Sequence, residues 1–292
     1  MRPMAGDTTA RAEIGIFGGS GFYSFAENLE EVEFDTPFGP PSAPVTVGEI
    51  AGRRIAFLPR HGRDHEFPPA AVPARANLWA MRMLGVRHVI GPCAAGSLST
   101  AIQPGDFVVL DQLVDRTWGR PDTYYDRGGP HHVSYADPYC PQLAPLVVAA
   151  GERIGITMHA AGTVVVIPGP RFSTRAESHR YHREGIDVIN MTQYPEAYLA
   201  RELGMHYAGI ALVTDYDTGI DDDPTIAPVT QDEVFAFFED NLHKVHDLLV
   251  DLLPTLPQGD PHGCSCAQAV GSLAHYESEI GESEIGESEI GA

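Results

Sequence analysis

The chain has 292 residues, of which 43% are hydrophobic and 20% are charged. These values are close to those of ordinary soluble proteins, so they exclude a disordered or collagen-like chain. No apolar run reaches the roughly 18 residues of a membrane span, and the N-terminus lacks the apolar core of a signal peptide. The sequence therefore predicts a cytoplasmic protein that makes no membrane contact.

The charged residues of the chain argue against nucleic-acid binding and against a Walker-type nucleotide site. It has 19 basic and 40 acidic residues and a net charge of -21. Such an acidic surface repels a polyanionic backbone, so nucleic acid is not an expected partner. The only lysine, Lys244, does not follow a glycine, which excludes a Walker phosphate loop. Any bound anion must then be held by arginine, histidine, hydroxyl or backbone N–H groups.

Apolar runs that end in glycine or polar residues predict the strands of an α/β fold. In chain order, we expect strands at 12–17, 31–34, 45–50, 53–58, 86–90, 106–110, 163–167, 186–190 and 207–214, and helices at 74–84, 142–154, 195–203 and 230–253. The second to fourth strands are spaced like an antiparallel meander. Thr230 and Glu233 have the spacing of a helix capping box. Strands and helices then alternate, which predicts one α/β domain with a largely parallel or mixed sheet.

The composition changes after Pro257. The segment from residue 258 is polar and glycine-rich, and it ends in a three-fold Glu-Ser-Glu-Ile-Gly repeat. Such a segment buries too little apolar surface to fold. We therefore expect a single domain over residues 10–257 and a C-terminal tail over 258–292 that is disordered from about residue 273.

Polar residues follow several predicted strands, at the sheet edge where α/β proteins bind ligands. They are Ser20, Arg60, His61, the 94–97 turn, Thr192, Asp215 and Asp217. Hydroxyls, an arginine and glycine-flanked N–H groups fit a phosphate-sized dianion. Two carboxylates would repel that anion, so Asp215 and Asp217 are expected to face a base or to supply a proton.

The two aspartates stand at i and i+2. On an extended segment both side chains point the same way, so their charges couple and one pKa rises. A carboxyl group that stays protonated is a general acid, and an anion site beside it favours phosphorolysis. Each motif is weak alone: the glycine-rich turn at Ser20 can be structural, Arg60-His61 can be a surface pair, and the aspartates can lie in an exposed loop.

Eight segments, in this order and spacing, carry a resemblance to a known family. They are IGIFGGSGF, DTPFGPPS, RHGRDH, GSLSTAIQPGD, DRTWGRP, GPRFSTRAE, DVINMTQYPEAYLA and VTDYD. From about Glu13 to about Leu253 the chain resembles the methylthioadenosine phosphorylases, within the trimeric purine nucleoside phosphorylases. The resemblance implies a three-layer α/β fold with a central mixed, largely parallel sheet flanked by helices.

The resemblance also implies where both substrates bind. Phosphate would be held by Ser20, Arg60, His61, the amide of Ala94 and Thr192. The nucleoside would be held by Phe172, Ser173, Met191, Asp215, Asp217, Val234 and Phe235, and by His132 from a neighbouring subunit. Asp215 would be the catalytic general acid. In relatives that prefer 6-oxopurines this position is typically asparagine, so the aspartate favours adenine.

The implied reaction is phosphorolysis of 5'-methylthioadenosine, and of other 5'-substituted adenosines, to adenine and a pentose 1-phosphate. Phosphate would be a co-substrate, with no cofactor and no metal, and the assembly would be a homotrimer or a dimer of trimers. Gln231 stands where some relatives carry an apolar residue, and Cys93 where the family often has threonine. A purine nucleoside phosphorylase of broader specificity, a related nucleosidase and a purine-binding module without turnover stay open as alternatives.

Four cysteines and 13 histidines are present. The cysteines are too few and too unevenly spread for a disulfide framework, so Cys93 and Cys140 are expected to be buried thiols. No HExxH or Cys-x-x-Cys set completes a metal site. Some archaeal relatives carry a Cys-x-Cys pair resembling Cys264-Ser265-Cys266, which leaves open a disulfide or two free thiols in a loose tail.

Overall fold

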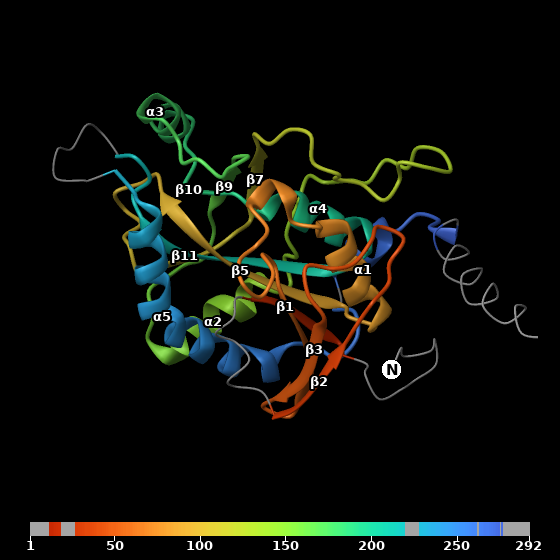
Figure 1. Cartoon of the computed structure of the whole chain (residues 1–292). Coiled ribbons are helices and arrows are strands. Elements are labelled where there is room, and N and C mark those ends of the chain that lie inside the picture. Colours follow the sequence, from red (N-terminus) through yellow and green to blue (C-terminus); the bar gives the residue numbers. More distant parts are fainter. Residues whose placement is uncertain (1–11, 19–26, 220–227, 262, 275, 277–292) are drawn as a thin grey trace, which may run out of the picture.

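A mixed sheet of 11 strands forms the centre of the molecule, with helices on both of its faces (Figure 1). The computed structural model describes residues 12–18, 27–219, 228–261, 263–274 and 276. Among these residues, six of the strand pairs run parallel, and four run antiparallel: β2–β3 and β3–β4 at one edge, β5–β10 and β6–β11 beside the central strands. The structure therefore confirms the expected three-layer fold.

The elements follow in chain order. The strands are β1 Ile14–Gly18, β2 Glu27–Val32, β3 Val45–Ile50, β4 Arg53–Pro59, β5 His88–Ser97, β6 Phe107–Val109, β7 Gln112–Asp115, β8 Met158–His159, β9 Thr163–Val166, β10 Val188–Asn190 and β11 His206–Asp215. The helices are α1 Ala74–Met83, α2 Ala144–Ile154, α3 Arg175–Arg183, α4 Gln193–Glu202 and α5 Gln231–Leu252, with short 3-10 helices η3 Pro69–Ala71, η4 Leu253–Thr255 and η5 Cys266–Ala269.

Strand β5 is the central strand of the sheet. It pairs in parallel with β1 and β11 and antiparallel with β10. The register with β11 runs from His88 opposite His206 to Gly96 opposite Asp215. Because β1, β4, β5 and β11 run in the same direction, their carboxyl ends lie along one edge of the sheet. This is the edge at which open α/β sheets bind ligands.

Two helical layers bury the sheet. Helices α1 and α4 pack against each other on one face, and α2 and α5 pack against each other on the other (Figure 1). Strand β11 is buried from His206 to Thr214, as its nearly all-apolar sequence predicts for a strand covered on both faces. Helix α5 begins with the predicted capping box between Thr230 and Glu233.

Strand β5 is longer than the sequence predicts. Its predicted end at Ile90 is wrong, because the strand continues through the glycines to Ser97. A Cβ atom at Gly91 would lie 1.9 Å from the Tyr207 hydroxyl, and one at Gly96 would lie 2.8 Å from an Asp215 carboxylate oxygen. These glycines therefore let neighbouring side chains approach the strand, and they do not form a turn.

The C-terminal segment packs on the body beyond the predicted boundary. Leu273 is 3% exposed and Tyr276 is fully buried. The Tyr276 ring lies 4.8 Å from that of Phe38 and 5.9 Å from that of Trp79. The prediction of disorder from about residue 273 is thus wrong for Leu273 and Tyr276. It is based on the mean polarity of the segment, and that mean does not register two apolar side chains that pack on the core. The Glu-Ser-Glu-Ile-Gly repeat lies outside the described residues.

None of the helices in the described part of the chain is long and apolar enough to cross a membrane.

Candidate functional site

Strand β11 ends at Asp215, and the chain turns directly after it. One carboxylate oxygen of Asp215 accepts the backbone N–H of Asp217 at 2.7 Å, and the other accepts the Thr214 hydroxyl at 2.7 Å. The register with β5 shifts between Val213 and Asp215, and Asp217 has a φ of 54°. The expectation that both aspartates project from one extended segment is therefore wrong, because a side-chain-to-backbone turn separates them.

Burial raises the pKa of both carboxyl groups. The pKa of Asp215 rises because of burial, against the hydrogen bonds from Thr214 and Asp217. Burial raises the pKa of Asp217 to about 6; the hydroxyls of Ser178 and Ser173 lower it, and the charge of Asp215 raises it. Coupling between the two charges is thus secondary to desolvation. A raised pKa is the property that a general acid needs, and both carboxyl groups have it.

Buried polar atoms surround Asp217. The hydroxyls of Ser178 and Ser173 interact with its carboxylate and lower its pKa, but in the described part of the chain neither hydroxyl nor Asp217 Oδ2 makes a hydrogen bond of full geometry. Buried polar groups in proteins are nearly always satisfied, so unsatisfied ones at a sheet edge indicate a polar ligand. The structure thus brings together Asp215, Asp217 and Ser173, as predicted for the base side of the site.

The loop that carries Phe172 and Ser173 packs on Met191. Gly169, with a φ of 63°, starts this loop, and a Cβ there would lie 2.6 Å from the Met191 sulfur. Arg120 donates to the carbonyl oxygens of Met191 and Pro168, at 2.9 Å each. Sequence reasoning missed Arg120 as a positioning residue, although the DRTWGRP segment contains it.

Arg60 is buried in an ion pair. Its Nε and Nη2 atoms donate to the two carboxylate oxygens of Glu196 at 2.6 and 2.8 Å, and Nη1 donates to the carbonyl of Pro92 at 3.1 Å. The Tyr207 hydroxyl donates to the same carboxylate at 2.5 Å. Glu196 therefore occupies the two N–H groups that Arg60 would use in a bidentate contact with phosphate, because a buried carboxylate needs a counter-charge. One N–H on each terminal nitrogen of Arg60 remains for an anion.

His61 is neutral at physiological pH. Its Nδ1 lies 2.8 Å from the carbonyl of Phe67, and since a carbonyl only accepts, Nδ1 carries the hydrogen. Burial lowers the pKa of His61 to about 4, and the charges of Arg60 and His65 act in the same direction. The ring stacks on His65 at 4.5 Å, and His65 meets Phe235 of α5 at 5.3 Å. The structure thus links the predicted phosphate side to the first turn of α5.

Two of the other predicted phosphate residues, Thr192 and Ala94, lie in the described part of the chain. Thr192 precedes α4 and lines a small cleft with Arg120 and Glu196. Ala94 is the one partly exposed position of β5. Cys93 beside it is a neutral thiol, because burial raises its pKa to about 11. Ser20 lies outside the described residues.

The remaining predicted nucleoside residues are Val234, Phe235 and His132. On α5, Val234 is half-buried and Phe235 is 45% exposed. His132 is exposed in the long loop that follows β7 (Figure 1). Its neighbour His131 contacts the carbonyl of Ala269, in the segment after α5. None of the contacts described for this chain joins His132 to the other predicted residues of the site.

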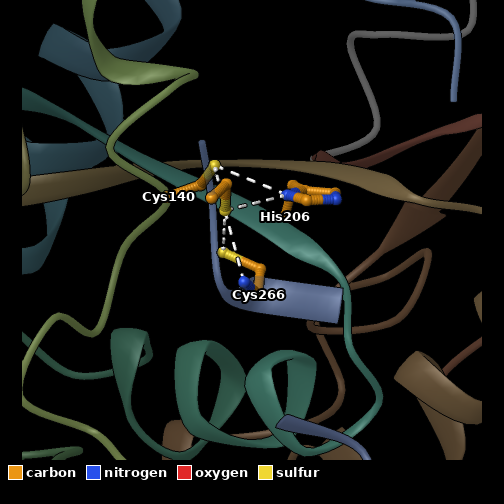
Figure 2. Close-up of side chains that lie close together, drawn as sticks. Cys140, His206 and Cys266 are labelled. Carbon is orange, nitrogen blue, oxygen red and sulfur yellow. Dashed lines mark hydrogen bonds between the residues drawn. The ribbon is translucent and has the colours of Figure 1, made fainter. Parts of the chain in front are cut away.

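A second group of reactive side chains lies at the opposite end of β11. Cys140, His206, Cys264 and Cys266 each present one ligand atom, and these atoms all lie within 4.8 Å of one another (Figure 2). Sequence reasoning missed this cluster because its members come from distant segments and lack Cys-x-x-Cys spacing. Cys264 and Cys266 are free thiols, as one of the two expectations had it, but they are packed on the body and not in a loose tail.

Comparisons with known proteins agree on one family. A model of the phosphorylase superfamily matches residues 13–254. The S-methyl-5'-thioadenosine phosphorylase of Mycolicibacterium smegmatis is 54% identical over 241 residues, which cover 82% of this chain and 90% of that protein. The purine nucleoside phosphorylase of Streptomyces coelicolor is 47% identical over 274 residues, covering 90% and 96%. A solved methylthioadenosine phosphorylase from an Antarctic soil metagenomic library has a TM-score of 0.83 at 38% identity, covering 89% and 91%.

Proposed function

The chain belongs to the phosphorylase superfamily, and on this basis we propose that it cleaves 5'-methylthioadenosine with phosphate to adenine and a pentose 1-phosphate. It is a pentosyltransferase of the purine nucleoside phosphorylase type. The observation that carries the assignment of the base is the buried aspartate pair after β11, beside hydroxyls that make no hydrogen bond of full geometry in the described ranges.

The aspartate pair divides the work on the purine. As the bond between C1' and N9 breaks, negative charge develops on the base and positive charge on the sugar. Burial raises the pKa of Asp215, which favours its role as the acid that gives a proton to N7. Asp217 and Ser173 take the hydrogen bonds of the 6-amino edge, which satisfies the buried oxygens near them. Met191 and Phe172 lie under the ribose and beside the base.

Phosphate then attacks C1' from the opposite side of the sugar. Because Glu196 balances the charge of Arg60, neutral donors hold most of the dianion: the Ala94 amide, the hydroxyls of Thr192 and Ser20, and the remaining N–H groups of Arg60. Neutral His61 offers Nε2 as an acceptor for the hydroxyl hydrogen of hydrogen phosphate. Phosphate is a co-substrate here, and we propose that no cofactor takes part.

The 5' side of the nucleoside is completed by a neighbouring subunit. Val234 and Phe235 approach it from α5, and His132 of another copy closes it, in a cytoplasmic trimer or dimer of trimers. Trp118, in the same loop as His132, is 79% exposed in the single chain. Tryptophan is enriched in protein interfaces, so Trp118 fits a contact with the neighbouring subunit.

A purine nucleoside phosphorylase of broader specificity is the second candidate. The Streptomyces coelicolor relative of that name supports it, as does Gln231, an exposed polar residue at the start of α5. A polar amide near the 5' position would accept a hydroxyl as readily as a methylthio group.

One experiment separates these reactions. The enzyme is incubated with 5'-methylthioadenosine, adenosine and inosine, each with and without phosphate, and the sugar product is identified. We expect adenine release only with phosphate, and a pentose 1-phosphate as product. Equal release in phosphate-free buffer would establish a nucleosidase, and comparable turnover of inosine would establish the broader phosphorylase.

A further inference from the structure

The cluster at the His206 end of β11 joins three parts of the chain (Figure 2). Cys140 precedes α2, and its backbone N–H donates to Tyr207 of β11. Cys264 and Cys266 come from the segment after α5. The Cys140 sulfur lies 3.6 Å from that of Cys264 and 3.6 Å from Nδ1 of His206, and the Cys264 sulfur lies 3.4 Å from the same nitrogen.

We propose that Cys140, His206, Cys264 and Cys266 bind a structural zinc ion. With Zn–S bonds of about 2.3 Å and Zn–N bonds of about 2.0–2.1 Å, a tetrahedron places its sulfur atoms roughly 3.8 Å apart and sulfur and nitrogen roughly 3.5 Å apart. The three separations given above agree with these values. A fourth, 2.8 Å between Cys264 and Cys266, must widen by about 1 Å to admit the ion. The remaining two, from the Cys266 sulfur to Cys140 and to His206, are within 4.8 Å.

Groups around the cluster support the ligands as they do in zinc sites. Nε2 of His206, on the far side of the ring from the sulfurs, lies 3.3 Å from a carboxylate oxygen of Asp260. That carboxylate is held in turn by Arg87 at 3.0 Å. A carboxylate on the second nitrogen fixes the tautomer of a ligating histidine and raises its basicity. The sequence therefore supplies an orienting group in addition to four ligands.

The sulfurs receive donors as well. Arg201, which is 5% exposed, donates from Nη1 to the Cys266 sulfur at 3.0 Å. The backbone N–H of Cys266 donates to the Cys264 sulfur at 3.3 Å. Three thiolates around one divalent ion leave a net charge of about -1, which the Arg201 guanidinium offsets. Such donors stabilise bound thiolates and explain a buried arginine at this position.

The donor set selects the metal and its role. Three thiolates and one imidazole favour zinc over the hard cations that prefer oxygen. Four protein ligands leave no open position for water or substrate, which is the property of a structural site. The ion would fasten the segment after α5 to β11 and to the segment before α2.

A disulfide between Cys264 and Cys266 is the competing use of these thiols. All four cysteines are free in the structure, and the 2.8 Å separation is longer than an S–S bond of about 2.05 Å. Oxidation would remove two of the four ligands, so the two uses exclude each other.

The test is the metal content of the full-length protein, purified without chelators. We expect about one zinc ion per chain, released on titration with a thiol-blocking mercurial. After replacement by Co²⁺, the protein should show the thiolate-to-metal and d–d absorption bands of a tetrahedral site. Cys264→Ser should lose the zinc, and Cys93→Ser, which changes the cysteine outside the cluster, should retain it.

The Co²⁺ spectrum of the unaltered chain keeps the test decisive if Cys264→Ser fails to fold. Wild-type protein that holds no zinc and gives no Co²⁺ bands under reducing conditions overturns the proposal. So does a mass lower by the two hydrogens of a disulfide in protein purified anaerobically. The proposal does not depend on the reaction, because none of these measurements involves catalysis.

Discussion

Strand β11 carries reactive side chains at both of its ends, and the chain builds the two ends differently. At the Asp215 end, the groups come from turns that directly follow strands, and several buried oxygens have no partner in the described residues. At the His206 end, the groups come from distant segments and face one another, with Asp260 and Arg201 closing the outside. The first arrangement suits a substrate that binds and is released. The second suits a metal ion that stays bound and holds the segments together. Substitutions should therefore change rates at the first end and stability at the second.

The largest effect is expected between the two ends, at Arg60. Arg60→Ala leaves the buried Glu196 carboxylate without its counter-charge, which should cost about 3–5 kcal/mol of unfolding free energy. Thermal and urea unfolding measure the loss, and Arg60→Ala/Glu196→Gln should recover part of it. A normal melting temperature with an increase in the phosphate KM alone would contradict this, and would place Arg60 with the substrate groups.

The next effect tests the Asp215 end. Asp215→Asn keeps the shape but cannot transfer a proton, so kcat for 5'-methylthioadenosine should fall about 10²-fold or more. Activity on 5'-methylthioinosine should fall less, since its leaving group departs more easily and asparagine suits a 6-oxopurine. The measurement is kcat/KM for both nucleosides with both proteins. An unchanged ratio would mean that Asp215 neither reads nor protonates the base.

A truncation tests the C-terminal segment. Removing residues 271–292 deletes the buried Leu273 and Tyr276. This should lower the free energy of unfolding by about 2 kcal/mol, the lower end of the range for the loss of a large buried side chain. A chain that ends at Tyr276 is the matched control and should melt like the full chain. Specific activity of the folded protein should be the same in all three. Equal melting of both truncations would show that this segment contributes nothing to stability.

The smallest expected effect is a pH dependence at Asp217. A carboxyl group whose pKa in the folded state exceeds its unfolded value destabilises the fold once it ionises. With a folded pKa of about 6 and an unfolded value of about 4, wild-type stability should fall as pH rises between these values. Asp217→Asn should thus melt higher than wild type above pH 6, and the gap should close toward pH 4. Asp137→Asn, at an exposed position, is the control.

The sequence predicted the substrate end of β11 better than the other end, for a physical reason. Residues that follow parallel strands gather at one sheet edge whatever the details of packing, so Asp215 and Arg60 could be grouped from their positions alone. Thr192 follows β10, which runs antiparallel to β5, so this rule does not place it. Their contacts could not be predicted: Glu196 as the partner of Arg60, and Arg120 as a clamp on Met191, depend on how α4 packs. The cluster at His206 requires the tertiary path of the chain after α5, which no local pattern encodes.

The register of β5 and β11 also constrains how the chain folds. His88 and His206 lie opposite each other although more than a third of the chain separates them. Contacts this distant in sequence form slowly, because the chain entropy of closing the intervening segment is lost before the pairing stabilises it. During synthesis, β5 therefore leaves the ribosome long before its partner and waits with an open edge. An unpaired edge of this kind readily pairs with other chains, so aggregation competes with folding until β11 is available to cover it.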